Sequence, residues 1–188
     1  AKNNIPADAI VVRSIVSSPL ADRIAEHYGV NMHAVLTGFK YIGGEILKLE
    51  EIGEEHRFVF GFEESCGYLK GTYARDKDAV EGAMIILEMT AYYKKLGMTL
   101  IDALEALYLR YGNYRERTVD IYMEGLDGIE RRRRTMSALR TCPPHVLGGY
   151  KVVSVGDYLL GSVTDLVSGK ISATSQPQSD VLYYTLEC

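Results

Sequence analysis

A glycine-bracketed cluster of polar side chains follows an apolar run in the stretch GFEESCG, residues 61 to 67. Neighbouring residues of an extended chain point to opposite sides, so Glu63 and Ser65 are expected to face one site while Glu64 faces away. A carboxylate accepts hydrogen bonds and a hydroxyl donates or accepts them, so the pair suits vicinal sugar hydroxyls. A solvated loop is the alternative. The flanking glycines permit unusual backbone angles and favour the functional interpretation.

Two further segments carry cations close to strand ends or helix starts. Thr37, Gly38 and Lys40 belong to TGFK, in which a lysine after a strand-end glycine can present a point charge to an anion. Arg75 and Lys77 belong to ARDKD, just before a helix whose N-terminus also favours anions. Taken singly, each segment is explained better as a charged, solvated surface.

The elements that must position these side chains alternate along the chain. The patterns predict strands over residues 9–18, 30–37 and 56–64, and helices over 18–29, 38–53, 77–97 and 98–112. This order is typical of a three-layer α/β/α sandwich with a mostly parallel sheet. Ligands of such sheets gather beyond the carboxyl ends of the strands. We therefore expect the 37–40 and 63–67 loops to open on the same edge, and Tyr92 and Tyr108 to lie in the core.

The sequence pattern changes after Gly112. Polar alternation predicts a strand over residues 114–125, a basic helix follows over 129–140, and short strands are expected within 150–170 and 181–188. We therefore divide the chain into an α/β/α domain, residues 1–113, and a partial α+β domain, residues 114–188.

Composition narrows the function classes. The 188 residues are 47% hydrophobic and 24% charged, which is ordinary for a globular protein, and the net charge of -4 gives no general attraction to nucleic acid. No apolar run reaches membrane-spanning length and no signal peptide is evident, so neither nucleic acid nor membrane is an expected partner. Cys66, Cys142 and Cys188 lack metal-binding spacing and are expected to be reduced thiols of a cytoplasmic protein. Cys66 is assigned a packing or incidental role.

Four consecutive arginines, residues 131–134, form the most basic run. On a helix they spread around most of the circumference, and Asp127 and Glu130 lie nearby in the sequence, so a solvated helix is favoured over a nucleic-acid site. An interaction protein that uses this helix remains an alternative.

Three motifs, TGFKYIGGEI, GFEESCGYL and ARDKDAV, resemble in order and spacing the α-D-phosphohexomutase family, in particular phosphoglucomutases and phosphomannomutases. The opening VVRSIVSSPLADRIAEHYGV is similar to the start of that family's third domain. The resemblance is good over residues 5 to 115 and looser beyond. It implies a four-domain parent that interconverts hexose 1-phosphates and 6-phosphates through a bisphosphate intermediate. A phosphoserine, an Mg2+ ion held by a D-G-D-G-D loop and a glucose 1,6-bisphosphate-type activator would serve that parent.

The resemblance also implies substrate-binding roles for seven residues. Glu63 and Ser65 would bind sugar hydroxyls. Thr37, Gly38 and Lys40 would line the cleft near the sugar, and Lys77 with Arg75 would hold phosphate or ring hydroxyls. The EES form is more similar to glucose-preferring mutases than to dual-specificity enzymes.

Several features of the family are missing from this sequence. It contains no phosphoserine loop, no D-G-D-G-D metal loop and no R-x-S-G-T phosphate loop, and it begins without Met. We expect a piece of a longer protein, covering domain 3 and part of domain 4, that holds no metal ligands and is inactive alone. Its partners would be a phosphosugar and the remaining domains of the parent. A phosphopentomutase-type relative and a stand-alone sugar-phosphate binding module are the alternatives.

Overall fold

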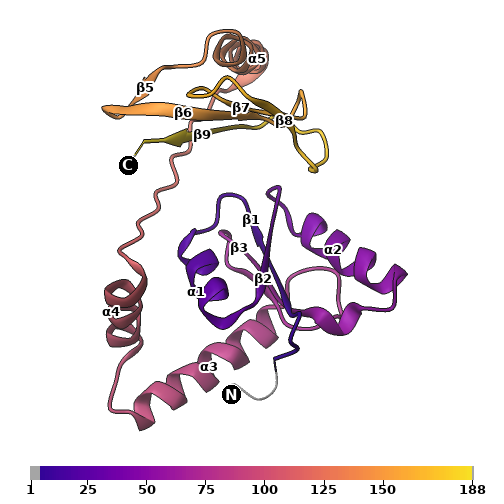
Figure 1. Cartoon of the computed structure of the whole chain (residues 1–188), viewed down its shortest axis with the longest axis vertical. Coiled ribbons are helices and arrows are strands. Elements are labelled where there is room, and N and C mark those ends of the chain that lie inside the picture. The colour runs from indigo at the N-terminus through magenta and orange to yellow at the C-terminus, as the bar shows by residue number, and fades with distance from the viewer. Residues whose placement is uncertain (1–4, 188) are drawn as a thin grey trace. The chain divides into compact units, whose positions relative to one another are not determined.

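The computed structural model describes residues 5–187 and divides the chain into two compact units, Ala1–Arg117 and Thr118–Cys188 (Figure 1). The elements of the first unit, in chain order, are β1 (Ile10–Ser14), α1 (Leu20–Tyr28), β2 (Asn31–Val35), α2 (Phe39–Glu51), the 3₁₀ turn η2 (Glu55–Arg57), β3 (Phe58–Glu63), β4 (Gly67–Leu69), α3 (Ala79–Lys95) and α4 (Leu100–Tyr111). The three strands and four helices predicted for this part of the chain are confirmed.

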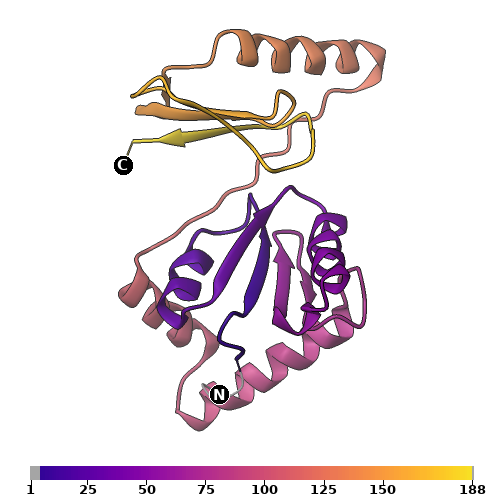
Figure 2. The same ribbon diagram turned by 45° about the vertical axis from the view of Figure 1, so that its right-hand side comes forward.

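The sheet of the first unit has the order β2-β1-β3-β4. The central strand β1 runs parallel to both β2 and β3, and β4 pairs antiparallel with β3. Helix α2 contacts β1 and β3 on one face, and α1 lies on the other face beside β2 (Figure 2). The predicted α/β/α layering with a mostly parallel sheet is therefore confirmed.

The main core lies between the sheet and α2. Ile10 and Val12 of β1 pack there with Ile42 and Ile46 of α2, and all four are at most 2% exposed. A Cβ atom placed on Gly61 of β3 would lie 2.5 Å from Cγ2 of Ile42. Gly61 therefore provides room for α2 rather than an unusual backbone angle.

The opposite face of the sheet is aromatic where β3 meets β4. Phe62 pairs with Tyr68 across the two strands, and Gly82 of α3 sits against the Tyr68 ring, with its ideal Cβ position 3.2 Å from Cδ2. Tyr92, further along α3, is 60% exposed, so its predicted place in the core is wrong. Helical spacing identifies a shared helix face but does not say what covers it. Tyr108 is half-buried.

The second unit is an antiparallel sheet with one helix. Its elements are α5 (Gly125–Thr141), β5 (Val146–Leu147), β6 (Tyr150–Asp157), β7 (Ser162–Asp165), β8 (Ile171–Ala173) and β9 (Leu182–Leu186), with sheet order β5-β6-β7-β8 and β9 paired to β6. Arg140 of α5 pairs with Asp157 and Asp180 and ties the helix to the sheet. The predicted α+β character is confirmed.

A strand predicted over residues 114–125 is wrong, because residues 112–124 are neither helix nor strand. Polar alternation marks a half-buried strand only where a neighbouring strand supplies hydrogen bonds, and among residues 5–187 no strand pairs with this segment.

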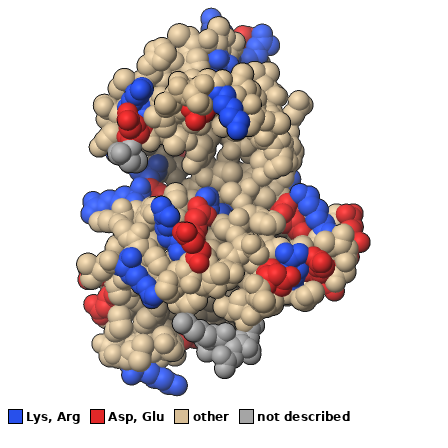
Figure 3. Space-filling model, viewed as in Figure 1, with Lys and Arg blue, Asp and Glu red and all other residues tan. Residues whose placement is uncertain are grey.

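The basic run 131–134 lies on α5 and all four arginines are exposed, as a solvated helix requires. Acidic and basic side chains are interspersed on the face in Figure 3. Within residues 5–187, none of the helices has the length and apolarity to cross a membrane.

Candidate functional site

The GFEESCG stretch forms a tight hairpin at the carboxyl edge of the parallel strands. Glu63 is the last residue of β3 and pairs with Gly67, the first residue of β4, so three residues, 64–66, form the loop. Cys66 takes the left-handed backbone conformation, with φ 56°, that commonly ends three-residue hairpin loops. The predicted strand over residues 56–64 includes Glu63, and the structure places Glu63 at the end of β3, whereas β4 was not predicted.

Glu63 is the centre of a three-residue cluster. Ser65 Oγ donates to Glu63 Oε1 over 2.8 Å, and Lys77 Nζ donates to the same oxygen over 2.6 Å. The Glu63 side chain is only 3% exposed, whereas that of Lys77 is 45% exposed. The structure therefore brings together three of the seven predicted residues, with a buried carboxylate beneath an accessible ammonium.

Gly67 makes this arrangement possible. A Cβ atom at this position would lie 2.7 Å from Glu63 Cγ and 2.9 Å from Lys77 Cδ. Gly67 does not adopt a positive φ. The expectation that the flanking glycines provide unusual angles is therefore wrong for both Gly61 and Gly67, since close approach of side chains is what excludes a larger residue.

Lys77 remains cationic in this environment. The hydrogen bond that Lys77 donates to Glu63 raises the pKa of Lys77 most, and the charges of Glu63, Asp76 and Glu64 add to the rise, while partial desolvation lowers it. An ammonium held this way suits an anionic or polyhydroxylated ligand, because it keeps its charge at all physiological pH values.

Arg75 points elsewhere. Its guanidinium pairs with Glu50 of α2 and donates to the backbone carbonyls of Thr72, at 2.5 Å, and Ala74, at 3.0 Å. These contacts fix the 70–78 segment against α2. The structure thus does not join Arg75 to the Glu63 cluster.

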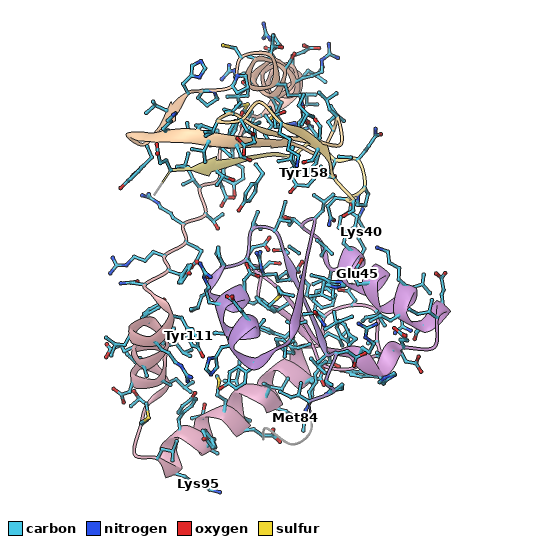
Figure 4. The ribbon with its side chains drawn as sticks, in the orientation of Figure 1. Lys40, Glu45, Met84, Lys95, Tyr111 and Tyr158 are labelled. Atoms are coloured by element: carbon cyan, nitrogen blue, oxygen red, sulfur yellow. The ribbon has the colours of Figure 1, made fainter. Side chains whose placement is uncertain are left out.

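The TGFK segment links the end of β2 to the start of α2, on the same edge of the sheet. Thr37 and Lys40 are exposed, and Figure 4 labels Lys40 at the start of α2. The Lys40 ammonium lies 4.9 Å from the centre of the Tyr41 ring. Gly38 has φ 119°, a conformation that favours glycine, and it forms the N-cap of α2. Hydrogen bonds do not tie this segment to Glu63; the two share an edge, as the strand order predicts.

Sequence reasoning missed one contact of the hairpin. Glu64 Oε2 accepts a 2.6 Å hydrogen bond from Ser14 Oγ, at the end of the central strand β1. The signal for it was the serine-rich turn RSIVSS after a β-branched run. No sequence rule couples that turn to a loop 50 positions later, so only the fold reveals the pair.

An apolar cavity of about 250 Å³ lies on the α1 side of the sheet, lined in part by Val11, Ile24 and Phe62. It offers no polar groups to a sugar phosphate. Among residues 5–187 there is also no group of three or more His, Cys, Asp or Glu side chains that could hold a metal ion.

Comparison with known proteins places these features in a family. The family described as "Phosphoglucomutase/phosphomannomutase, alpha/beta/alpha domain III" matches residues 1–111. The chain belongs to the phosphoglucomutase/phosphomannomutase family. Its α/β/α unit, with the Glu63–Gly67 pairing at the strand edge, is the part that carries this match.

Individual relatives extend the similarity along the chain. The phosphoglucomutase of Staphylococcus haemolyticus (strain JCSC1435) is 35% identical over 179 residues, which are 95% of this chain and 32% of that protein. The phosphoglucomutase of Staphylococcus aureus (strain bovine RF122 / ET3-1) is 36% identical over 173 residues, covering 92% and 31%. The chain thus spans about a third of the length of these relatives.

A solved structure shares the fold. The open form of the exocytosis-sensitive phosphoprotein pp63/parafusin, a phosphoglucomutase from Paramecium, matches with a TM-score of 0.54 at 18% identity, over 93% of this chain and 28% of that one. At this identity the match supports the fold alone.

Proposed function

We propose that this chain is the sugar-recognition part of a phosphoglucomutase or phosphomannomutase that interconverts hexose 1-phosphate and 6-phosphate through a bisphosphate intermediate. The observation that carries the proposal is the convergence of Ser65 and Lys77 on the buried carboxylate of Glu63, in a chain of this family. The hydroxyl and the carboxylate would bind sugar hydroxyls, and Lys77 would contact phosphate or ring hydroxyls.

The geometry of Glu63 suits hydroxyl recognition. Both hydrogen bonds from Ser65 and Lys77 go to Oε1, so we assign the second oxygen, Oε2, to a sugar hydroxyl. A hydrogen bond to a buried charged group is stronger than one between neutral groups, and the carboxylate cannot rotate freely while two donors hold it. The bisphosphate must bind in two orientations, so contacts to hydroxyls shared by both orientations are the useful ones.

The remaining predicted residues have supporting roles in this proposal. Thr37, Gly38 and Lys40 would line the cleft from the β2–α2 turn, where Lys40 is exposed. Arg75 would hold the 70–78 segment through Glu50 and would reach a phosphate only by leaving that partner. Charge from Lys77 would help to stabilise the transferring phosphoryl group.

Phosphoryl transfer itself needs groups beyond this cluster. We propose that the nucleophilic phosphoserine, the Mg2+ ion with its ligands, and the glucose 1,6-bisphosphate-type activator belong to the full-length cytoplasmic parent, and that the chain alone is inactive. When bound, the metal ion would neutralise charge on the phosphoryl oxygens. The role of this chain is to bind and orient the sugar.

Substitution of Glu63 by Gln in the full-length protein tests the assignment. Losing one charged hydrogen bond of about 1.5–3 kcal/mol should lower kcat/KM for glucose 1-phosphate by about 10- to 100-fold without unfolding the protein. Glu51→Gln, at an exposed position of α2, is the matched control and should leave turnover unchanged. Unchanged turnover of the Glu63 variant would refute the role, and glucose 1-phosphate turnover by the chain alone would refute its inactivity.

A further inference from the structure

Ser14 occupies the centre of the strand edge at which the proposed sugar ligands lie. It is the last residue of β1, which lies between β2 and β3, and it is only 1% exposed. Its hydroxyl contacts Glu64 Oε2 at 2.6 Å and Ser17 Oγ at 2.9 Å. A buried hydroxyl on the neighbouring strand thus reaches the residue between Glu63 and Ser65.

The single proton of the Ser14 hydroxyl gives these contacts a direction. An ionised carboxylate only accepts hydrogen bonds, so Ser14 donates to Glu64 and the hydroxyl of Ser17 must donate to Ser14. The 2.6 Å separation from Glu64 falls in the range of charge-assisted O–H···O⁻ bonds. Consecutive donors polarise one another, so Ser17 strengthens the contact between Ser14 and Glu64.

Arg13 fixes the backbone that carries both serines. Its guanidinium is buried and makes two hydrogen bonds to Asp22 of α1, at 2.8 and 2.6 Å. Nη1 of the same group donates to the backbone carbonyls of Ser14, at 2.9 Å, and Ser17, at 3.2 Å. The donor to Glu64 is therefore held by a rigid turn rather than by a mobile loop.

The 64–66 loop needs such support. Its residues are exposed, and Cys66 adopts the left-handed conformation that L residues rarely take. Strand pairing with Gly67 fixes Glu63, whereas Ser65 lies at the tip of the loop. The contact from Ser14 to Glu64 ties this tip to β1.

We propose that Ser14 is a positioning residue for sugar recognition: by holding Glu64 it fixes the 64–66 loop so that Ser65 stays oriented toward Glu63. This inference rests on the proposed function of Glu63 and Ser65, and it adds two residues, Ser14 and Glu64, that do not themselves contact the sugar.

A double-mutant cycle in the full-length protein tests the inference. Ser14→Ala and Glu64→Ala should each lower kcat/KM for glucose 1-phosphate by about 10-fold, as expected for the loss of one charge-assisted hydrogen bond. The double variant should be no worse than Glu64→Ala, since Ser14 then has nothing to hold. Ser17→Ala keeps the donor to Glu64 and should have a smaller effect, which controls for loss of a buried serine in the same cluster.

The outcomes separate this inference from the proposed function. An unchanged kcat/KM for Ser14→Ala would overturn the positioning role. A further 10-fold loss of kcat/KM when Ser14→Ala is combined with Glu64→Ala would also overturn it, because a merely structural serine would act whether or not Glu64 is present. Thermal unfolding of each variant distinguishes lost folding from lost orientation. Failure of Glu63→Gln to reduce turnover would instead refute the proposed function.

Discussion

Lys77 Nζ lies 2.6 Å from Glu63 Oε1, and this ion pair joins the end of β3 to the segment that precedes α3. The two residues are 14 positions apart, with the hairpin and β4 between them. The carboxylate is buried and the ammonium half-exposed, so the pair both stabilises the edge of the sheet and presents a cation to solvent.

Removal of the Lys77 charge should change stability in a pH-dependent way. The folded-state pKa of Lys77 is raised above its ordinary value of 10.5, so its contribution is complete below that pH and is lost as pH rises through the raised pKa. We expect wild type to be more stable than Lys77→Met near neutral pH, with the difference narrowing above about pH 10.5. Urea unfolding across this range measures the difference.

Lys95→Met, which removes an exposed lysine of α3, is the control for the pH dependence of stability. Parallel pH profiles for wild type and Lys77→Met would contradict the assigned ion pair.

Gly67→Ala should disrupt the same pair without removing either charge. The new Cβ would meet Glu63 Cγ at 2.7 Å and Lys77 Cδ at 2.9 Å, so one of the side chains must move. Overpacking of this kind costs about 1–3 kcal/mol. Denaturant unfolding should detect the loss, and glucose 1-phosphate turnover of the full-length protein should fall with it. A variant as stable and as active as wild type would show that the pair tolerates displacement.

The sequence predicted most of the α/β/α unit because its signals are local. β-branched runs, caps and stop glycines are local signals of this kind. Thr99 caps α4, because its hydroxyl accepts from the backbone N–H of Asp102 while its own backbone N–H donates to the Asp102 carboxylate. β4 was missed because three residues carry too little pattern, and pairing with β3 is what makes them a strand.

The candidate site was predictable only in part. Residue types and a strand end pointed to Glu63 and Ser65, whereas Lys77 was added by the family resemblance. The separation of Arg75 from that cluster depends on Glu50, and the Ser14–Glu64 contact depends on the strand order, which sequence spacing does not encode.

Two adjacent glycines of α2 provide a matched pair. A Cβ on Gly43 would lie 2.6 Å from the backbone oxygen of Arg75, whereas a Cβ on Gly44 would have nothing within 4 Å. Gly44→Ala should therefore stabilise the protein by about 0.5–1 kcal/mol, because alanine favours helix interiors. Gly43→Ala should destabilise it by about 1–3 kcal/mol by pushing the 70–78 segment away. Shifts of the denaturant midpoint from wild type in the same direction for both variants would contradict this packing.

Cys66→Gly tests whether the hairpin needs a particular backbone rather than a thiol. Cys66 is exposed, which rules out the packing role and leaves the incidental one, and its φ of 56° lies in the left-handed region. That conformation costs an L residue about 1–2 kcal/mol, while glycine adopts it freely but loses about 0.4–1 kcal/mol to the entropy of the unfolded chain. We therefore expect Cys66→Gly to be more stable by about 0.5–1 kcal/mol in urea unfolding, with turnover of the full-length protein retained. Cys66→Val, which is β-branched, should be less stable than wild type. Loss of turnover in a stably folded glycine variant would instead assign the thiol itself to ligand binding.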